Sequence, residues 1–300
     1  MKQPIMNQER MNLMKKILTM VLTLGLAVSM VTGCASGSSK EEAKKVKIGY
    51  VNWSEGIAMT NLAAAIFEEK MGYEVDMVLA DVAPVFTSLA SGNTDLFLDT
   101  WLPVTHKEYL EKYGKDIVDM GVEYENASLG LVVPSYVDID SIEQLNDNKD
   151  TFGGKIIGID SGAGLMNATE DAIDQYGLDY ELVSGSGPAM TASLKKAIDK
   201  QEPIVVTGWT PHWMFARWDL KILEDPKGIY GDAETIHAYS RKGFEEDMPE
   251  AAEFIKNFKL SDEVLSDLMA KIEDSEDDPI VTAKKWMNDN EDIVNTWLGK

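Results

Sequence analysis

Residues 203–218, PIVVTGWTPHWMFARW, join a run of β-branched residues to three tryptophans, and this junction is the feature from which the fold is best predicted. The run at 203–208 has the length and the apolar content of a buried strand, and the glycine and proline that follow are typical of its end. An indole is a large apolar ring with one polar edge. Trp209, Trp213 and Trp218 must therefore either pack in the interior or form a surface that binds something.

Strand-like and helical runs alternate along the rest of the chain. Strands are predicted at 46–51, 73–80, 96–101, 129–134, 155–160, 180–184 and 203–208. Helices are predicted at 56–70, 84–89, 164–176 and 189–200, and a helical region begins at 236, with breaks near Pro249, Ser261 and Asp278. Because this alternation is typical of parallel sheets covered by helices on both faces, we expect an α/β fold with mostly parallel sheets.

The polar stretch at 135–154 separates two β-α-β sets, which predicts two similar lobes. We expect lobe I to comprise residues 46–134 and 235–300, because the last helices would return to cover the first set. Lobe II would comprise residues 135–234. Ligands in open α/β sheets bind beyond the carboxyl ends of the strands, so the predicted ligand site lies in the cleft between the lobes.

The first 34 residues have the pattern of a secretion signal. Lys15 and Lys16 precede an apolar run at 17–31, which is too short and wrongly flanked for a permanent transmembrane helix. We therefore expect an exported protein whose signal peptide covers residues 1–34. The next stretch, ASGSSKEEAKK at 35–45, has the small and charged composition of a flexible tether.

Cys34 is the only cysteine in the 300 residues, so the chain can form no intramolecular disulfide and no four-cysteine metal site. One interpretation is an incidental thiol in a discarded peptide. The other follows from the V-x-G-C end of the apolar run, which resembles the bacterial lipobox. In that motif the cysteine is lipidated and becomes the first mature residue, which implies a lipid anchor on the outer face of the cell membrane.

The chain beyond the signal peptide is strongly acidic. Residues 1–34 carry four Lys or Arg and one Asp or Glu, which leaves 24 basic against 50 acidic residues and a formal charge of −26. Binding to nucleic acid or to an anionic membrane surface needs a basic face, so we expect neither. Solubility alone is a sufficient reason for most of this charge.

Three of the seven tryptophans, Trp53, Trp101 and Trp209, come at the ends of predicted strands, where the fold would place its ligand. Converging indoles suit a quaternary ammonium, because such a cation is weakly hydrated and has no proton to donate. Each ring contributes about 0.5–1 kcal/mol when exposed and about 2 kcal/mol when desolvated. A primary amine would instead need a carboxylate or carbonyls. Carbohydrate stacking is the competing use of such rings, but it would bring polar partners that the sequence does not identify.

The other four tryptophans are expected to be structural. Trp286 and Trp297 lie in the C-terminal helical region and are predicted to belong to the core. Trp213 and Trp218 follow a proline on a short helical or turn segment, and we expect them to pack beneath the site.

Two segments indicate an anion site. The glycine-rich turn DSGAGLMN at 160–167 leads from a strand into a helix, so the backbone amides of Gly164 and Leu165 would point outwards at a positive helix end. In TWLPVTHKEY, Thr105 and Glu108 have the spacing of a capping box, which would place His106 in the first turn of a helix beside Trp101.

His106 could equally be an ordinary surface residue, and His212 and His237 are predicted to be structural. The three strand-end tryptophans would select a cation, and the neighbouring amides and His106 would bind an anion. Together they predict a receptor for a zwitterion, which carries both charges.

Five motifs in this order resemble a known family. They are GYVNWSEGIAMTN at 49–61, LDTWLPVTHKEY at 98–109, LGLVVPSY at 129–136, IGIDSGAGLMNATEDAI at 157–173 and PIVVTGWTPHWMF at 203–215. Together they are similar to the glycine betaine/proline betaine substrate-binding proteins of ABC importers, which have the type II periplasmic-binding-protein fold of two lobes around a cleft.

The resemblance implies the role of each site residue. Trp53, Trp101 and Trp209 would enclose the trimethylammonium group, and the Gly164 and Leu165 amides would hold the carboxylate together with His106. Leu165 stands where isoleucine is frequent in the family. Because the main-chain amide does the binding, we expect little consequence.

The resemblance further implies a non-catalytic, monomeric receptor that needs no cofactor or metal and delivers a betaine to ABC permease and ATPase subunits. Carnitine or choline remain alternative ligands, because related proteins take them. An enzyme acting on a choline-containing substrate is the alternative of another class, but the sequence has no G-x-S-x-G, no HExxH and no second cysteine. A receptor for a sugar or an ordinary amino acid is the remaining alternative.

Overall fold

The computed structural model describes residues 44–300. The predicted signal peptide, the predicted lipidation of Cys34 and most of the predicted tether lie outside the described residues. The tether was predicted to extend to residue 45, and this boundary is wrong, because Lys45 is the first residue of strand β1. Its pairing with Glu74 on the neighbouring strand, which includes a 2.8 Å salt bridge, explains the difference.

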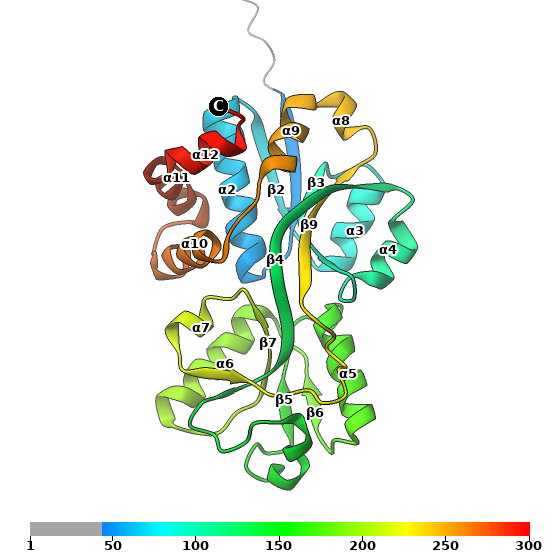
Figure 1. The fold of residues 1–300 in the computed structure, drawn as a ribbon, viewed down its shortest axis with the longest axis vertical. Helices are drawn as coiled ribbons and strands as arrows, with labels where there is room; N and C mark the ends of the chain where they lie inside the picture. The colour runs from blue at the N-terminus through cyan, green and yellow to red at the C-terminus, as the bar shows by residue number, and fades with distance from the viewer. Residues whose placement is uncertain (1–43) are drawn as a thin grey trace, which may run out of the picture. The chain divides into compact units, whose positions relative to one another are not determined.

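The first of two sheets has the strand order β2-β1-β3-β9-β4 (Figure 1). The strand bounds are β1 (Lys45–Tyr50), β2 (Glu74–Leu79), β3 (Leu96–Leu102), β4 (Ile117–Pro134) and β9 (Glu234–Arg241). β1 runs parallel to β2 and β3, because a helix carries the chain back after each of the first two strands. β9 runs antiparallel to both β3 and β4.

The second sheet has the strand order β4-β7-β5-β6, with β8 beside the end of β4. The further bounds are β5 (Lys155–Ile157), β6 (Glu181–Val183), β7 (Val206–Thr210) and β8 (Leu220–Ile222). β4 belongs to both sheets: Ala127 pairs with β9, and the next residue, Ser128, pairs with Thr210 of β7. Asn126, with φ of 64°, takes a left-handed conformation directly before this change of partner.

The expected α/β class is confirmed, but the sheets are mixed rather than mostly parallel. The parallel sets are β2-β1-β3 and β7-β5-β6, and the antiparallel pairs all involve β4 or β9. The sequence pattern predicted only residues 129–134 of β4, and it placed β9 in a helical region. Both errors concern strands whose pairing partners lie far away in sequence, so local periodicity carries little information about them.

Of the helices from the N-terminal and C-terminal segments, α2, α3 and α9 pack on the first sheet, and the others pack mainly on these three (Figure 1). Their bounds are α2 (Ser54–Met71), α3 (Val82–Ala90), α4 (Lys107–Tyr113), α8 (Phe244–Asp247), α9 (Pro249–Asn257), α10 (Asp262–Asp274), α11 (Pro279–Asp289) and α12 (Glu291–Trp297). α2 is buried along most of its length, because it packs against the sheet on one side and against α10 and α11 on the other. It ends at Gly72, whose φ of 74° needs a residue that tolerates a left-handed conformation.

The predicted breaks in the C-terminal region are confirmed. Pro249 and Pro279 occupy the first positions of α9 and α11, where a missing N–H does no harm. The hydroxyl of Ser261 accepts a hydrogen bond from the amide of Val264 and caps α10. Asp278 directly precedes α11.

The second sheet carries its own helices. Their bounds are α5 (Gly164–Tyr176), α6 (Gly187–Lys200) and α7 (Met214–Arg217), and the 3-10 turns η1 (Ile142–Gln144) and η2 (Asn146–Asn148) lie in the polar stretch before β5. α5 matches the predicted helix residue for residue. Its N-terminus lies just past the carboxyl end of β5, which is where parallel strands are expected to present a ligand site.

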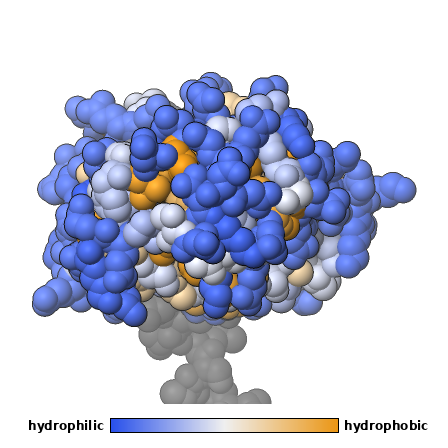
Figure 2. Space-filling view, turned by 90° about the horizontal axis from the view of Figure 1, so that it is seen from below, coloured by the Kyte–Doolittle hydropathy of each residue, from blue (hydrophilic) through white to orange (hydrophobic). Residues whose placement is uncertain are grey.

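The face drawn in Figure 2 is mostly hydrophilic, and hydrophobic residues show on it only as small separate patches. No helix within residues 44–300 combines the length and the apolar character needed to cross a bilayer.

Candidate functional site

The three strand-end tryptophans line one hollow. Trp53 is the N-cap of α2, Trp101 is the sixth residue of β3, and Trp209 is the fourth residue of β7. All three are at most 5% exposed. The hollow measures about 280 Å³, including space open to solvent. The rest of its lining comes from Glu55, Thr105, Leu129, Ile159, Ala163, Gly164 and Leu165.

A carboxylate accepts the hydrogen bond of each indole N–H at this site. Trp209 Nε1 donates to Glu55 Oε2 at 2.7 Å, and Trp101 Nε1 donates to Asp99 Oδ1 at 2.8 Å. Trp53 Nε1 donates to Asp160 Oδ2 at 3.1 Å. Since every indole N–H is already bonded, what the rings still offer a ligand is their carbon surface, which is the part that attracts a cation.

These acidic partners were not predicted from the sequence, although two of them follow a simple spacing. Asp99 lies two residues before Trp101 on β3, and side chains two apart on a strand share a face. Glu55 lies two residues after Trp53, in the first turn of α2. Its bond to Trp209 joins residues 154 apart in sequence, and no local pattern indicates such a bond.

Glu55 and Asp99 are each 1% exposed, and burial controls their ionisation. Burial raises the pKa of Glu55 well above its ordinary value, and the nearby charge of Asp99 adds to this effect. Burial also raises the pKa of Asp99 to about 7, against the opposing effect of the hydrogen bond from Trp101. The other carboxylate oxygen of Asp99, Oδ2, is buried and has no hydrogen-bond partner among the described residues.

His106 is fully buried and stacks against Trp53, with ring centroids 5.9 Å apart and planes 13° from parallel. The backbone N–H of Trp101 donates to its Nδ1 at 2.9 Å, so in the neutral ring the proton lies on Nε2. Nε2 has no partner within residues 44–300. Burial lowers the pKa of His106 to about 3, so the ring is a neutral donor at physiological pH.

The capping box predicted around His106 does not form. His106 is itself the N-cap of α4, and no side chain caps the helix. The hydroxyl and the amide of Thr105 bind the carboxylate of Glu234 instead, as does the amide of Val104. The buried carboxylate of Glu234 on β9 therefore holds the loop that leads into α4. Because Thr105 binds this distant carboxylate, its spacing from Glu108 did not produce a capping box.

The predicted amide donors lie at the start of α5. Gly164 and Leu165 are buried and line the hollow, and within the described chain neither amide N–H has an acceptor. A Cβ at Gly164 would lie 2.1 Å from the carbonyl oxygen of Thr105, so only glycine permits this close approach of the two backbones.

Of the remaining four tryptophans, two lie where the sequence predicted and two do not. Trp286 and Trp297 are buried core residues, as predicted. Trp213 and Trp218 are half-buried and form an edge-to-face pair with centroids 5.3 Å apart. They do not pack beneath the hollow but line a separate, larger cleft, which shares only Trp209 with the hollow.

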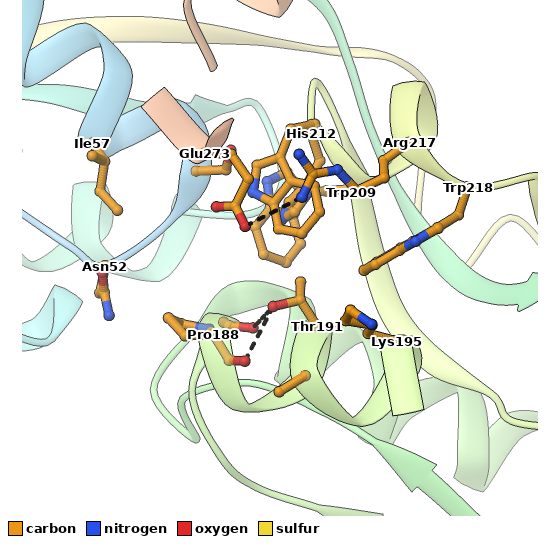
Figure 3. A pocket seen from close by; sticks show the side chains of 14 residues that line it. Asn52, Ile57, Pro188, Thr191, Lys195, Trp209, His212, Arg217, Trp218 and Glu273 are labelled. Carbon is orange, nitrogen blue, oxygen red and sulfur yellow. Dashed lines mark hydrogen bonds and ion pairs between the residues drawn. The ribbon is translucent and has the colours of Figure 1, made fainter. Parts of the chain in front are cut away.

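This larger cleft measures about 800 Å³, including space open to solvent, and is drawn in Figure 3. Its wall includes Arg217 of α7, whose guanidinium lies 5.1 Å from the ring centre of Trp213. Arg217 also pairs with Glu273 of α10 at 3.8 Å (Figure 3). Its second partner on α10 is Asp274.

His212 and His237 take structural roles, as predicted. The amide of Met214 donates to Nδ1 of the buried His212, whose ring packs edge-on against Trp209. His237 of β9 contacts Asp119 of β4 at 3.0 Å. Among residues 44–300, no cluster of three or more His, Cys, Asp or Glu side chains is arranged to hold a metal ion.

The family model described as the substrate binding domain of ABC-type glycine betaine transport systems matches residues 44–289. The chain belongs to this family. The family consists of binding proteins, so the chain is a receptor of an ABC transport system and not an enzyme.

Two curated relatives show how far the likeness extends along the sequence. The glycine betaine/carnitine transport binding protein GbuC of Listeria monocytogenes is 50% identical over 145 residues, which is 47% of this chain and only about half (48%) of that relative. The trimethylamine N-oxide-binding protein of Pelagibacter ubique is 25% identical over 312 aligned positions, which cover 93% of this chain and 98% of that one.

Solved structures of family members have the same fold. The glycine betaine/L-proline-binding protein ProX of Borrelia burgdorferi is 41% identical, with a TM-score of 0.81 over 85% of this chain and 96% of that one. Lactococcal OpuAC, in its closed conformation with glycine betaine, is 36% identical, with a TM-score of 0.80 over 85% and 99%. A choline-binding protein in complex with choline is 28% identical, with a TM-score of 0.78 over 85% and 91%.

Proposed function

We propose that this receptor binds glycine betaine or a closely related quaternary-ammonium zwitterion in the hollow lined by Trp53, Trp101 and Trp209. The observation that carries the proposal is the convergence of three buried indoles whose N–H groups are all bonded to carboxylates. Ring surfaces of this kind attract a methylated cation and offer no hydrogen-bond partner to a primary amine.

The carboxylate of the ligand would be held by His106 and by the amides of Gly164 and Leu165. Nε2 of His106 is a buried donor without a partner in the described residues, and the two amides are free at the N-terminus of α5. A helix N-terminus favours an anion, and a carboxylate would satisfy donors that otherwise stay unbonded at a cost of about 1–3 kcal/mol each.

Residues 46–134 with 235–300 would form one lobe and residues 135–234 the other, and the ligand would hold them together. Under this division the first lobe supplies Trp53, Trp101 and His106, and the second supplies Trp209 and the two amides. Ligand can touch all of these groups only when the lobes are closed. Binding therefore favours the closed state by the contacts that exist only there.

In its closed state the receptor would deliver its ligand to the permease and ATPase subunits of an ABC importer, as family membership suggests. Cys34 would carry the lipid that keeps the receptor at the outer face of the cell membrane. Labelling the expressed protein with a radioactive fatty acid tests this, because Cys34→Ala should abolish the label.

Carnitine and choline form the second candidate class of ligand. They are favoured by the names of two relatives, the glycine betaine/carnitine protein and the choline complex. Both present the same trimethylammonium group to a cage.

Calorimetric titration, with tryptophan fluorescence as a second readout, tests the proposal. The panel should include glycine betaine, proline betaine, carnitine, choline, dimethylsulfoniopropionate and trimethylamine N-oxide, with glycine and maltose as compounds that should not bind. Micromolar binding corresponds to about 8 kcal/mol, which lies within reach of a ligand of this size. Binding of glycine or maltose with no response to any of the methylated cations would overturn the proposed function.

A further inference from the structure

Three carboxyl groups in and near the cage are buried without a cation to balance them. Glu55 begins α2, Asp99 lies on β3 and Glu123 lies on β4, and each is 1% exposed. None of the three forms a salt bridge with a Lys or Arg of the described chain. An unpaired buried carboxylate is unfavourable, and proteins normally avoid it by retaining the proton.

Two of these groups hold rings of the cage and belong to segments that pack against each other. Glu55 lines the hollow and holds Trp209, and Asp99 holds Trp101. The backbone that follows Glu55 packs onto Asp99, since a Cβ at Gly56 would lie 2.5 Å from Asp99 Oδ2. That oxygen has no partner within residues 44–300, so it is free to hold or release a proton.

We propose that Glu55 and Asp99 together are the counter-charge of the cage: without ligand this pair of carboxyl groups retains a proton, and a permanent cation entering the hollow displaces that proton to solvent. The carboxyl O–H bond breaks, its electron pair stays on the oxygen, and the proton passes to buffer. The inference rests on the proposed function, because the displacing group is the quaternary ammonium. It adds that ligand binding releases a proton.

Other titratable groups around the pair do not replace it in this role. Glu123 faces Asp99 from β4, and burial, with the charge of Asp99, raises its pKa so that it stays protonated. Burial lowers the pKa of His106, beyond β3, and of His212, beyond β7, to about 3 each, so both stay neutral. On β9, Glu234 is satisfied by the amides of Val104 and Thr105 and the Thr105 hydroxyl.

The remaining carboxylate anchor differs from the pair. Asp160, which follows β5, bonds Trp53 and is only half-buried. It therefore provides a matched control for an effect that depends on deep burial rather than on anchoring an indole.

Calorimetric titration of glycine betaine into the intact soluble receptor at pH near 7, in phosphate and in Tris, measures the proton directly. The two buffers differ strongly in ionisation enthalpy, so released protons appear as a difference in observed heat. We expect on the order of half to one proton per ligand, and a Kd that falls by up to about tenfold per pH unit as the pH rises through the region near 7. Equal heats in both buffers together with a pH-independent Kd would overturn the inference.

Variants locate the source of the proton. Glu55→Gln and Asp99→Asn keep an oxygen that can accept the indole N–H, and each should abolish most of the proton release. Asp160→Asn should leave the release unchanged, even where it weakens binding. Full release in both Glu55→Gln and Asp99→Asn would contradict the assignment. If one variant fails to fold, the other variant and the wild-type titration still show whether the Glu55–Asp99 pair releases the proton.

A cation-free analogue separates shape from charge. In 3,3-dimethylbutanoate a tert-butyl group replaces the trimethylammonium of glycine betaine and the carboxylate is kept. We expect it to bind more weakly and to release no proton. Release of the same number of protons by both compounds would contradict the inference. If no quaternary ammonium compound binds, the proposed function fails and this inference with it, whereas binding without proton exchange contradicts the inference alone.

Discussion

The indole nitrogen of Trp209 lies 2.7 Å from Glu55 Oε2, although 154 residues separate the two in sequence. Trp209 belongs to the second sheet, and Glu55 begins the helix that covers the first. The bond therefore links an aromatic wall of the hollow to the other sheet. It fixes the ring by its N–H edge, and it places a buried carboxylate beside the space that a cation would occupy.

Replacing Trp209 should weaken ligand binding. Trp209→Ala removes one ring of the cage and leaves Glu55 without its donor, so we expect the Kd for glycine betaine to rise about tenfold or more. Isothermal titration measures this. Trp297→Phe is the control, because Trp297 is equally buried but lies in α12, with its N–H bonded to the carbonyl of Lys259. Equal losses of affinity in both variants would remove the evidence for a cage.

His106 should matter most to ligands that carry a carboxylate. Since Nε2 of His106 is an unpartnered donor in the described structure, His106→Ala should raise the Kd for glycine betaine several-fold more than the Kd for choline, which has no carboxylate. The quantity to compare is the ratio of the two dissociation constants, which is insensitive to a general loss of stability. A ratio unchanged from wild type would show that His106 only supports Trp53, against which it stacks.

The sequence predicted well those features that depend on neighbours along the chain. The helix at 164–176 and the end of α2 at Gly72 follow from local periodicity and backbone preference. Trp53, Trp101 and Trp209 were predicted to meet because each comes at the end of a predicted strand, and open α/β sheets bind ligands beyond the carboxyl ends of their strands.

Features that depend on distant partners were missed. The antiparallel pairing of β9 with β3 and β4 joins segments more than 100 residues apart, and residues 236–241 alone do not distinguish a strand from the helices that follow. The carboxylate behind Trp209 was missed for the same reason. Asp99 could have been found, because the alternation of β3 puts it on the same face as Trp101.

Glu123 should make the protein less stable as the pH rises. It is buried on β4, neither of its carboxyl oxygens has a partner in the described residues, and burial raises its pKa well above the ordinary value. The unfolded chain loses this proton near pH 4.3, whereas the folded chain keeps it. The stability due to the proton is therefore fully present below about pH 4.3 and is lost above it, by up to about 1.4 kcal/mol per pH unit until the pH reaches the raised pKa.

Glu123→Gln removes this titration and keeps the shape of the side chain. Its stability relative to wild type, from urea unfolding at several pH values between about 5 and 8, should increase with pH. Glu125→Gln is the control, because Glu125 is exposed on the same strand. A stability difference for Glu123→Gln that is independent of pH would show that its carboxyl group is not held protonated in the fold.

Arg217 should strengthen the binding of every ligand by about the same factor. It lies in the proposed second lobe and pairs with Glu273 and Asp274 of the first, so these contacts would favour the closed form and would not touch the ligand. Exposed ion pairs contribute about 0.2–1 kcal/mol each, so loss of both pairs in Arg217→Ala should raise the Kd about two- to thirtyfold for glycine betaine and choline alike, and less at high salt. Lys285→Ala is the control, because the Lys285–Asp277 pair is exposed and lies within one proposed lobe. Titrations of both ligands at low and high salt measure the effect, and a change in the ratio of their affinities would place Arg217 at the ligand rather than between the lobes.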